Sequence, residues 1–196
     1  SRRGLRMGDL GDPAATAESA RWTATTTNRE LVALGAAPFS EKEVADIVEQ
    51  LVVMSRRLVP YLGDVSALIR AACAKNEPVL FEGAQGAMLD LDHGTYPFVT
   101  SSNCVAAQAA VGCGVGHQFL GRVVMVSKAY STRVGEGPFV TELDDDTGAF
   151  LRRVGNEFGA TTGRPRRCGW LDLVALRHAV AINGGEDLAL TKLDVL

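Results

Sequence analysis

The segment WLDLVALRHAVAINGGEDLALTKLD, residues 170–194, decides the fold because a helical pattern leads into a short apolar strand. We expect the helix over WLDLVALRHAVAI and the strand over DLALTKLD. Upstream, the apolar runs PVLFEG and RVVMVSKAY predict strands over 79–81 and 123–127, and CVAAQAAVG predicts a helix of small residues. Short apolar strands that alternate with helices indicate an α/β fold, with a mostly parallel sheet flanked by helices.

Residues 14–76 have a helical texture, rich in alanine and broken at 35–38 and 60–63. The sequence SEKE predicts a helix start in which Ser40 and Glu43 form a capping box. A further helix is expected over about 64–75. The chain therefore divides into a mainly helical segment, 1–77, and an α/β part, 78–196. The apolar residues after the capping box share one helical face: Val44, Ile47, Val48, Leu51, Val52, Leu58 and Val59.

The composition is that of a globular protein, with 46% hydrophobic and 22% charged residues among 196. A net charge of -3 and the absence of interleaved aromatic residues disfavour an RNA-binding role for the basic sequence RPRR. No run approaches the roughly 18 apolar residues of a membrane span. The four cysteines lack metal-type spacing and are interpreted as reduced packing residues of a cytoplasmic protein: Cys73, Cys104, Cys113 and Cys168.

Four polar segments follow the expected strands. In parallel α/β folds, ligands bind beyond the carboxyl ends of the strands. This rule nominates EGAQG after 79–81, STRVGEG after 123–127, the loop 155–169, and TKLD at the end of the last strand. All four are rich in glycine, threonine or charge, so we expect a polar ligand site. The acidic stretch ELDDDTG is interpreted as a turn that precedes the loop 155–169.

Several side chains in these segments have two interpretations. Gln85 can donate to and accept from the edge of a heterocyclic base. Asp90, Asp92 and His93 could hold a metal, but a hydrogen-bonded turn is favoured because a third ligand with suitable spacing is not evident. The polar run at 100–103 either caps the helix that follows or holds a phosphate, and the sequence leaves both possibilities open.

The stretch NEFGATTGRPRRCGWLD, residues 156–172, gathers three arginines behind a turn rich in glycine and threonine. Solvated surface arginines are the alternative, but the glycines allow close approach of a ligand, and Pro165 fixes φ between two of the arginines. We interpret the segment as an anion-binding loop. The arginines are Arg164, Arg166 and Arg167.

TKLD, residues 191–194, matches the [NT]-K-x-D pattern of guanine-nucleotide proteins. At a strand end, the carboxylate of Asp194 would accept hydrogen bonds from the ring N–H and the exocyclic amine of guanine. The stem of Lys192 would lie along the base. Adenine lacks this pair of donors, so the motif predicts a guanine site.

Four stretches resemble adenylosuccinate synthetases in their order and spacing: VLFEGAQGAMLDLDHGTYPFVTSSN, KAYSTRVGEGPFVTEL, NEFGATTGRPRRCGWLDLVALRHAV and LTKLDVL. The resemblance covers essentially 79–196, and RRGLRMGDL also fits, whereas 11–77 fits as a variable helical region. It implies a GTPase-like core with a helical insertion. It also implies a cytoplasmic homodimeric ligase of the AMP branch of purine synthesis, which uses GTP to join L-aspartate to IMP.

The resemblance also assigns ligands. Arg2 would reach across the dimer to the partner's IMP phosphate, and Arg167 is given a structural role. The IMP contacts would be Arg2, Gln85, Thr100, Val134 and Arg164. The aspartate contacts would be Ala160, Thr161, Thr162, Gly163, Arg164 and Arg166. The GTP contacts would be Arg166, Lys192, Leu193 and Asp194.

The family's phosphate loop, its Mg²⁺-binding aspartate base and its histidine acid are expected upstream of this chain. We therefore expect no catalytic or metal-binding residue here beyond assistance from Gln85 at the IMP base. His93, His117 and His178 are not assigned to the missing roles. We interpret the chain as a central part of a longer protein, inactive alone. The alternative is a non-catalytic guanine-nucleotide-binding or dimerisation module, which a phosphate loop in the full-length protein would exclude.

Overall fold

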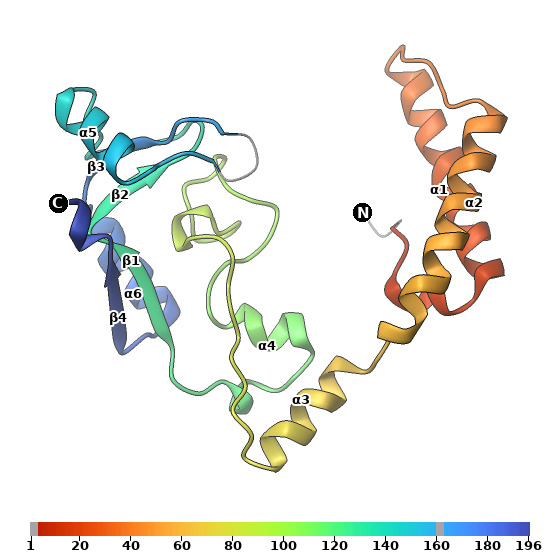
Figure 1. Ribbon diagram of the computed structural model, residues 1–196, viewed down its shortest axis with the longest axis horizontal. Coiled ribbons are helices and arrows are strands. Elements are labelled where there is room, and N and C mark those ends of the chain that lie inside the picture. Colours follow the sequence, from red (N-terminus) through yellow and green to blue (C-terminus); the bar gives the residue numbers. More distant parts are fainter. Residues whose placement is uncertain (1–3, 160–162) are drawn as a thin grey trace. The chain divides into compact units, whose positions relative to one another are not determined.

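The structure is a computed structural model that describes residues 4–159 and 163–196. It divides into two compact units, Ser1–Asp64 and Val65–Leu196 (Figure 1). The division lies before the change in sequence texture at Pro78, because the helix that starts at Val65 belongs to the second unit. No helix within the described residues is long and apolar enough to cross a membrane.

The first unit is a pair of helices, α1 (Pro13–Ala33) and α2 (Glu41–Leu58), with short 3₁₀ turns at Met7–Gly11 and Val59–Tyr61. The capping box at the start of α2 is confirmed: the Glu43 N–H donates to Ser40 Oγ at 3.2 Å, and the Ser40 N–H donates to Glu43 Oε2 at 2.8 Å. The expected apolar face is partly covered. Val48 is buried, whereas Ile47 is 42% exposed.

The second unit contains four strands and four helices among its described residues. The helices are α3 (Val65–Ala74), α4 (Gln108–Cys113), α5 (Asp146–Val154) and α6 (Leu173–Asn183). The strands are β1 (Val124–Lys128), β2 (Tyr130–Arg133), β3 (Arg167–Trp170) and β4 (Asp187–Thr191). Short 3₁₀ turns lie at Ala87–Leu89, His117–Phe119 and Leu193–Val195.

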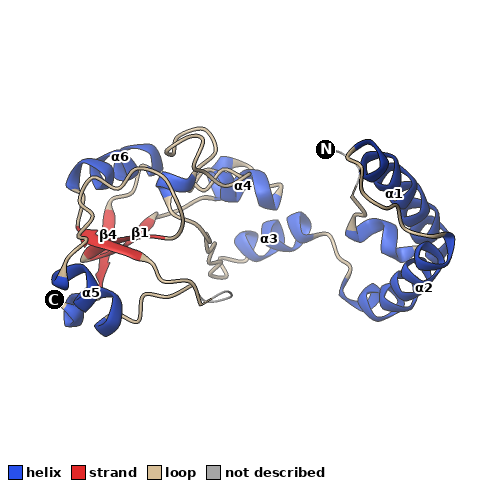
Figure 2. Cartoon of the chain, turned by 90° about the horizontal axis from the view of Figure 1, so that it is seen from above, coloured by secondary structure: helices blue, strands red, loops and turns tan. Residues whose placement is uncertain are grey.

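The strands form two ladders. β1 and β4 are parallel, in register from Val124 opposite Asp187 to Lys128 opposite Thr191. β2 and β3 are antiparallel, from Tyr130 opposite Trp170 to Arg133 opposite Arg167. Figure 2 shows α6 on one side of the β1–β4 pair. The α/β class and the parallel pairing are confirmed, and the antiparallel ladder is an addition that the sequence did not indicate.

The strand expected at 79–81 is wrong, because these residues are in irregular structure. A strand needs a neighbour to satisfy its backbone groups, and no described residue pairs with this segment. Leu80 is 90% exposed. This short apolar run has the residue types of a strand, but it has no partner strand among the described residues.

The acidic stretch interpreted as a turn instead starts helix α5, which the sequence reading missed. Asp145 caps this helix by accepting a hydrogen bond from the Gly148 N–H at 3.0 Å. Leu151 from the helix is buried. It joins Tyr130, Cys168 and Val195 in the core of the unit. The four cysteines are free, and Cys168 is buried as expected for a packing residue.

Candidate functional site

Two of the nominated segments follow the parallel ladder at the same edge. STRVGEG was expected to be a loop, but its first three residues, 131–133, belong to β2 and pair with β3. Lys128 and Thr191, the last residues of β1 and β4, are opposite each other in the register. The Ala129 N–H donates to the Thr191 carbonyl at 2.8 Å, which extends the pairing by one bond. The segments STRVGEG and TKLD therefore start from neighbouring positions.

The arginine loop is closed at its base by backbone hydrogen bonds. The Arg166 N–H donates to the Glu157 carbonyl at 2.9 Å, and the Gly159 N–H donates to the Arg164 carbonyl at 2.8 Å. Gly163 has φ of 64°, a conformation that favours glycine. The predicted contacts Ala160, Thr161 and Thr162 lie outside the described residues. Gly163 and Arg164 are exposed.

Arg167 is not part of this loop, although the sequence reading placed it there. It begins strand β3, and its guanidinium donates to both carboxylate oxygens of Glu142 and to the carbonyls of Gly135 and Gly137. The guanidinium also lies 5.5 Å from the centre of the Phe139 ring. These contacts support the structural role expected for Arg167. The arginine loop therefore ends at Arg166, before β3 begins.

Glu157 is a buried acid that connects the loop to β1. It is 1% exposed, and its Oε2 accepts hydrogen bonds from Lys128 Nζ and Arg166 Nη1, each at 2.7 Å. Its Oε1 accepts a bond from the Tyr130 hydroxyl at 2.6 Å. Burial would raise the pKa of Glu157, but the bonds from Lys128 and Tyr130 outweigh it and lower the pKa. The group is therefore a carboxylate at neutral pH.

Sequence reasoning missed Glu157. Its available signal was a single acid, beside Gly155 and Gly159, at the start of a segment that is otherwise basic. The burial of Glu157 and its three hydrogen-bond donors depend on the contact between strand β1 and the arginine loop, which a local sequence pattern does not encode.

TKLD begins at Thr191, the last residue of β4. The strand expected to run on to Asp194 ends at Thr191, because Leu193–Val195 form a 3₁₀ turn. Lys192 has φ of 61°, and its ammonium donates to the Gly155 carbonyl at 2.8 Å, so the motif is tied to the start of the arginine loop. Val195 is 5% exposed and anchors the turn in the core, whereas Asp194 is exposed. A carboxylate presented in this way is accessible to a base.

The interpretation of Asp90, Asp92 and His93 as a hydrogen-bonded turn is supported. The Asp90 carboxylate accepts from the N–H groups of Asp92 and His93, both at 3.0 Å, from the Cys104 N–H, and from Asn103 Nδ2 at 3.3 Å. Asp90 lies outside the apolar core, but its own loop encloses it and leaves it 0% exposed. Among the residues that the structure describes, no group of three or more His, Cys, Asp or Glu is placed to hold a metal ion.

The cap proposed for residues 100–103 is wrong. Helix α4 starts at Gln108, and the residue at its N-cap is Ala107. Thr100 instead pairs through its N–H with the Leu89 carbonyl at 2.9 Å. The run is thus part of the loop that Asp90 organises, and its possible role toward phosphate stays a prediction.

We expect Asp90→Asn to lower the free energy of unfolding of the full-length protein by about 2 kcal/mol at pH 7, because an amide leaves N–H donors without an acceptor. Burial would raise the pKa of Asp90, but the bonds from Cys104, His93 and Asp92 lower it well below its usual range. The stabilisation is therefore present above the unfolded carboxyl pKa of about 4 and is lost as pH falls further.

Urea unfolding of both proteins at several pH values measures this difference. Asp92→Asn is the matched control, since Asp92 is exposed and accepts one recorded bond, from Asn103 Nδ2 at 2.7 Å. Equal losses from the two variants would contradict the role given to Asp90.

Arg133 joins a further segment to the site. Its Nε donates to the Glu136 carbonyl at 2.8 Å, while its Nη2 donates to Thr95 Oγ1 at 3.1 Å and to the Phe98 carbonyl at 2.9 Å. The loop that carries Thr100 is thereby tied to the end of β2. Val134 follows Arg133 and is 46% exposed.

The described contacts bring three of the four nominated segments together. Lys192 connects TKLD to the arginine loop, and Lys128 connects that loop to STRVGEG, because its Nζ donates both to Glu157 Oε2 and, at 2.8 Å, to Thr132 Oγ1. EGAQG is linked less directly: Gln85 is exposed, and Cys104 Sγ lies 3.9 Å from its Oε1.

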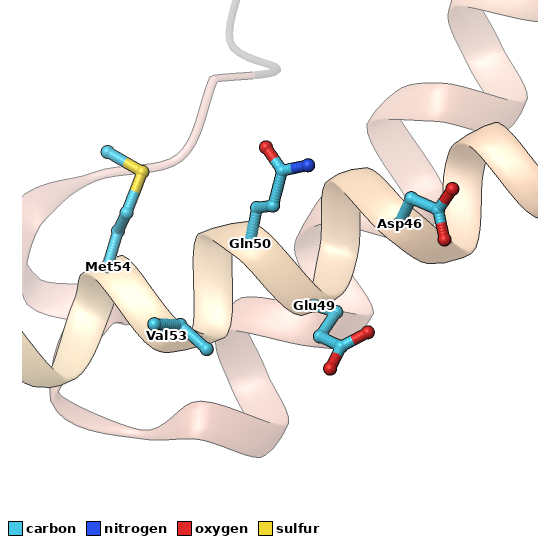
Figure 3. Close-up of a pocket in the computed structure, with 5 residues that line it drawn as sticks. All are labelled: Asp46, Glu49, Gln50, Val53 and Met54. Carbon is cyan, nitrogen blue, oxygen red and sulfur yellow. The ribbon is translucent and has the colours of Figure 1, made fainter.

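A surface hollow of about 500 Å³ lies elsewhere, on helix α2 of the first unit (Figure 3). It is lined by Asp46, Glu49, Gln50, Val53 and Met54. None of the predicted ligand contacts lines it, so it supplies no part of the candidate site.

Comparisons with known proteins identify the family of the chain. A model of the adenylosuccinate synthetase family matches residues 1–196. The chain is 53% identical over 196 residues to the adenylosuccinate synthetase of Anaeromyxobacter dehalogenans (strain 2CP-C), and 54% identical over 197 residues to that of Oleidesulfovibrio alaskensis. Each match covers 100% of this chain and 45% of the relative.

The fold agrees as well. A solved structure of fully ligated adenylosuccinate synthetase from Plasmodium falciparum superimposes with a TM-score of 0.88 and 39% sequence identity. It covers 100% of this chain, which spans 45% of that structure. The chain spans less than half the length of these relatives, and it belongs to the adenylosuccinate synthetase family.

Proposed function

We propose that this chain is the central part of a cytoplasmic enzyme that joins L-aspartate to IMP at the expense of GTP, giving adenylosuccinate, GDP and phosphate on the AMP branch of purine synthesis. The observation that carries the proposal is the bond from Lys192 to the Gly155 carbonyl. It ties TKLD to the base of the arginine loop, so the nucleotide site and the anion site that we propose would be adjacent. Membership of the family supports the reaction.

The proposed chemistry has two steps. IMP loses the proton on N1 to a base, and its 6-oxygen takes the γ-phosphoryl group of GTP, which leaves GDP. The amine of L-aspartate then attacks carbon 6, the carbon–oxygen bond breaks, phosphate departs, and the amine loses a proton. Both steps gather negative charge, which guanidinium groups stabilise through bidentate hydrogen bonds.

We assign roles to this chain as follows. Arg164 would contact IMP and aspartate, and Arg166 would contact aspartate and GTP. Gly163 would place its backbone near the aspartate carboxylates, and Ala160, Thr161 and Thr162 would complete that loop. IMP would also meet Gln85 near its 6-oxygen, Thr100 at its phosphate and Val134 at its ribose. Guanine would be read by Lys192, Leu193 and Asp194.

Mg²⁺ is used by this family, but the described residues do not fit a site for it, because they offer no cluster of three metal-ligating side chains. We therefore assign no metal ligand to this chain and derive no step through the ion. The catalytic base and acid are likewise proposed to come from parts of the longer protein.

The test is an assay of the full-length protein with IMP, L-aspartate and GTP, in which adenylosuccinate is measured and each substrate is omitted in turn. We expect product formation that depends on all three. GTP binding without product would favour the alternative, a non-catalytic guanine-nucleotide-binding or dimerisation module.

We further propose a homodimer in which Arg2, which lies outside the described residues, serves the partner's IMP phosphate. An inactive Arg2→Leu dimer mixed with an inactive Arg164→Leu dimer should regain activity, because each hybrid contains one intact composite site. Subunit exchange is verified by native mass spectrometry. Exchange without recovered activity would contradict the shared site.

A further inference from the structure

Two cations share one oxygen of a buried acid beside the arginine loop. Lys128 Nζ and Arg166 Nη1 each lie 2.7 Å from Glu157 Oε2. The Glu157 side chain is 2% exposed, whereas the Lys128 and Arg166 side chains are 27% and 29% exposed. The Glu157 carboxylate is thus enclosed, whereas the side chains of both cations remain partly exposed to solvent.

Glu157 is itself held firmly. Its N–H donates to the Arg152 carbonyl at 2.9 Å, and its carbonyl accepts from the Arg166 N–H at 2.9 Å. The Tyr130 hydroxyl fixes the second carboxylate oxygen. Gly155 leaves the necessary room, because a Cβ there would collide with the Tyr130 hydroxyl. A fixed backbone and a fixed second oxygen leave Oε2 in one place.

Arg166 needs such a partner. An arginine side chain loses rotamer entropy when it is held in one geometry. Lys128 also repels it, since two cations on the same oxygen are close neighbours. One negative charge between two positive charges leaves the trio with a net charge of +1, so it remains attractive to an anion.

We propose that Glu157 is a positioning residue: it holds the Arg166 guanidinium in place for the aspartate carboxylate and GTP. This role rests on the proposed function, which assigns those ligands to Arg166. Glu157 touches neither ligand, and its effect on the reaction passes through Arg166.

The experiment is a double-mutant cycle in the full-length protein, with Glu157→Gln and Arg166→Leu made singly and together. We expect Glu157→Gln to reduce kcat/KM for aspartate about tenfold, as a displaced binding group does, and to leave the KM of IMP unchanged. In the Arg166→Leu background, the same change should have less than a twofold further effect on kcat/KM.

Asp187→Asn is the matched control, because it likewise neutralises a carboxylate that pairs with an arginine, here Arg122, and it lies outside the cluster around Glu157. It should retain aspartate kinetics within twofold. Circular dichroism and the thermal midpoint show whether each variant is folded. If Glu157→Gln does not fold, Glu157→Asp replaces it, since it keeps the charge but withdraws the oxygen by one methylene, and the same cycle applies.

Equal losses from Glu157→Gln with and without Arg166 would overturn the positioning role, as would a uniform rise in the KM of all three substrates. A wild-type protein that makes no adenylosuccinate would instead overturn the proposed function, and this role with it. The two failures are therefore distinguished by the wild-type assay.

Discussion

Asp194→Asn in the full-length protein is expected to change the preferred nucleotide from GTP to XTP. The Asp194 carboxylate can only accept hydrogen bonds, which matches the two donors that guanine presents. Xanthine carries a carbonyl in place of the exocyclic amine, and the asparagine amide can donate to that carbonyl. Sites that hydrogen-bond a particular group discriminate by roughly 10⁴-fold, because a mismatch leaves buried polar atoms unpaired.

The measurement is kcat/KM for GTP and for XTP with IMP and aspartate saturating. Asp187→Asn is the matched control, because it removes the same charge at the opposite end of β4, where Asp187 pairs with Arg122. The control should still prefer GTP. Equal weakening of GTP and XTP by Asp194→Asn would show that TKLD does not read the base.

Arg164→Leu should lower kcat/KM for aspartate without unfolding the protein, because it removes a charge-stabilising donor. The loss of transition-state stabilisation calculated from kcat/KM is expected to be about 2–4 kcal/mol. Arg164 is exposed in the arginine loop, so its side chain contributes little packing. The thermal midpoint should therefore stay close to that of the wild type, while aspartate KM, kcat or both are affected.

Steady-state kinetics of all three substrates, together with thermal unfolding, measure this effect. Arg153→Leu is the control, since Arg153 is an exposed arginine in the last turn of α5 and has no predicted ligand. Near-normal kinetics of Arg164→Leu would remove Arg164 from the site. A fall in activity that follows a fall in stability would point to a structural role.

Local patterns were reliable where the interactions themselves are local. The capping box of Ser40 and Glu43 was predicted because its partners lie three residues apart. The helix expected over 170–182 is found at Leu173–Asn183, and the strand expected over 187–194 is found at Asp187–Thr191, so the elements were predicted but their ends were not. The prediction of a strand failed at 79–81, where a strand depends on a distant partner. Helix α5 is an exception to this rule, because its cap at Asp145 is a local contact with Gly148 and was nevertheless missed.

The sequence by itself determined the α/β class, the basic loop with Arg164 and Arg166, and the TKLD sequence that ends in Asp194. The loop and TKLD are patterns of neighbouring residues, and the class follows from local helix and strand patterns. Only the tertiary structure decided which contacts bring the arginine loop and TKLD together. Lys128 and Arg166 are far apart in the chain, and their meeting at Glu157 depends on β1 and the arginine loop converging. Lys192 likewise reaches Gly155 because β4 pairs with β1 in one register, a long-range choice that no local pattern encodes.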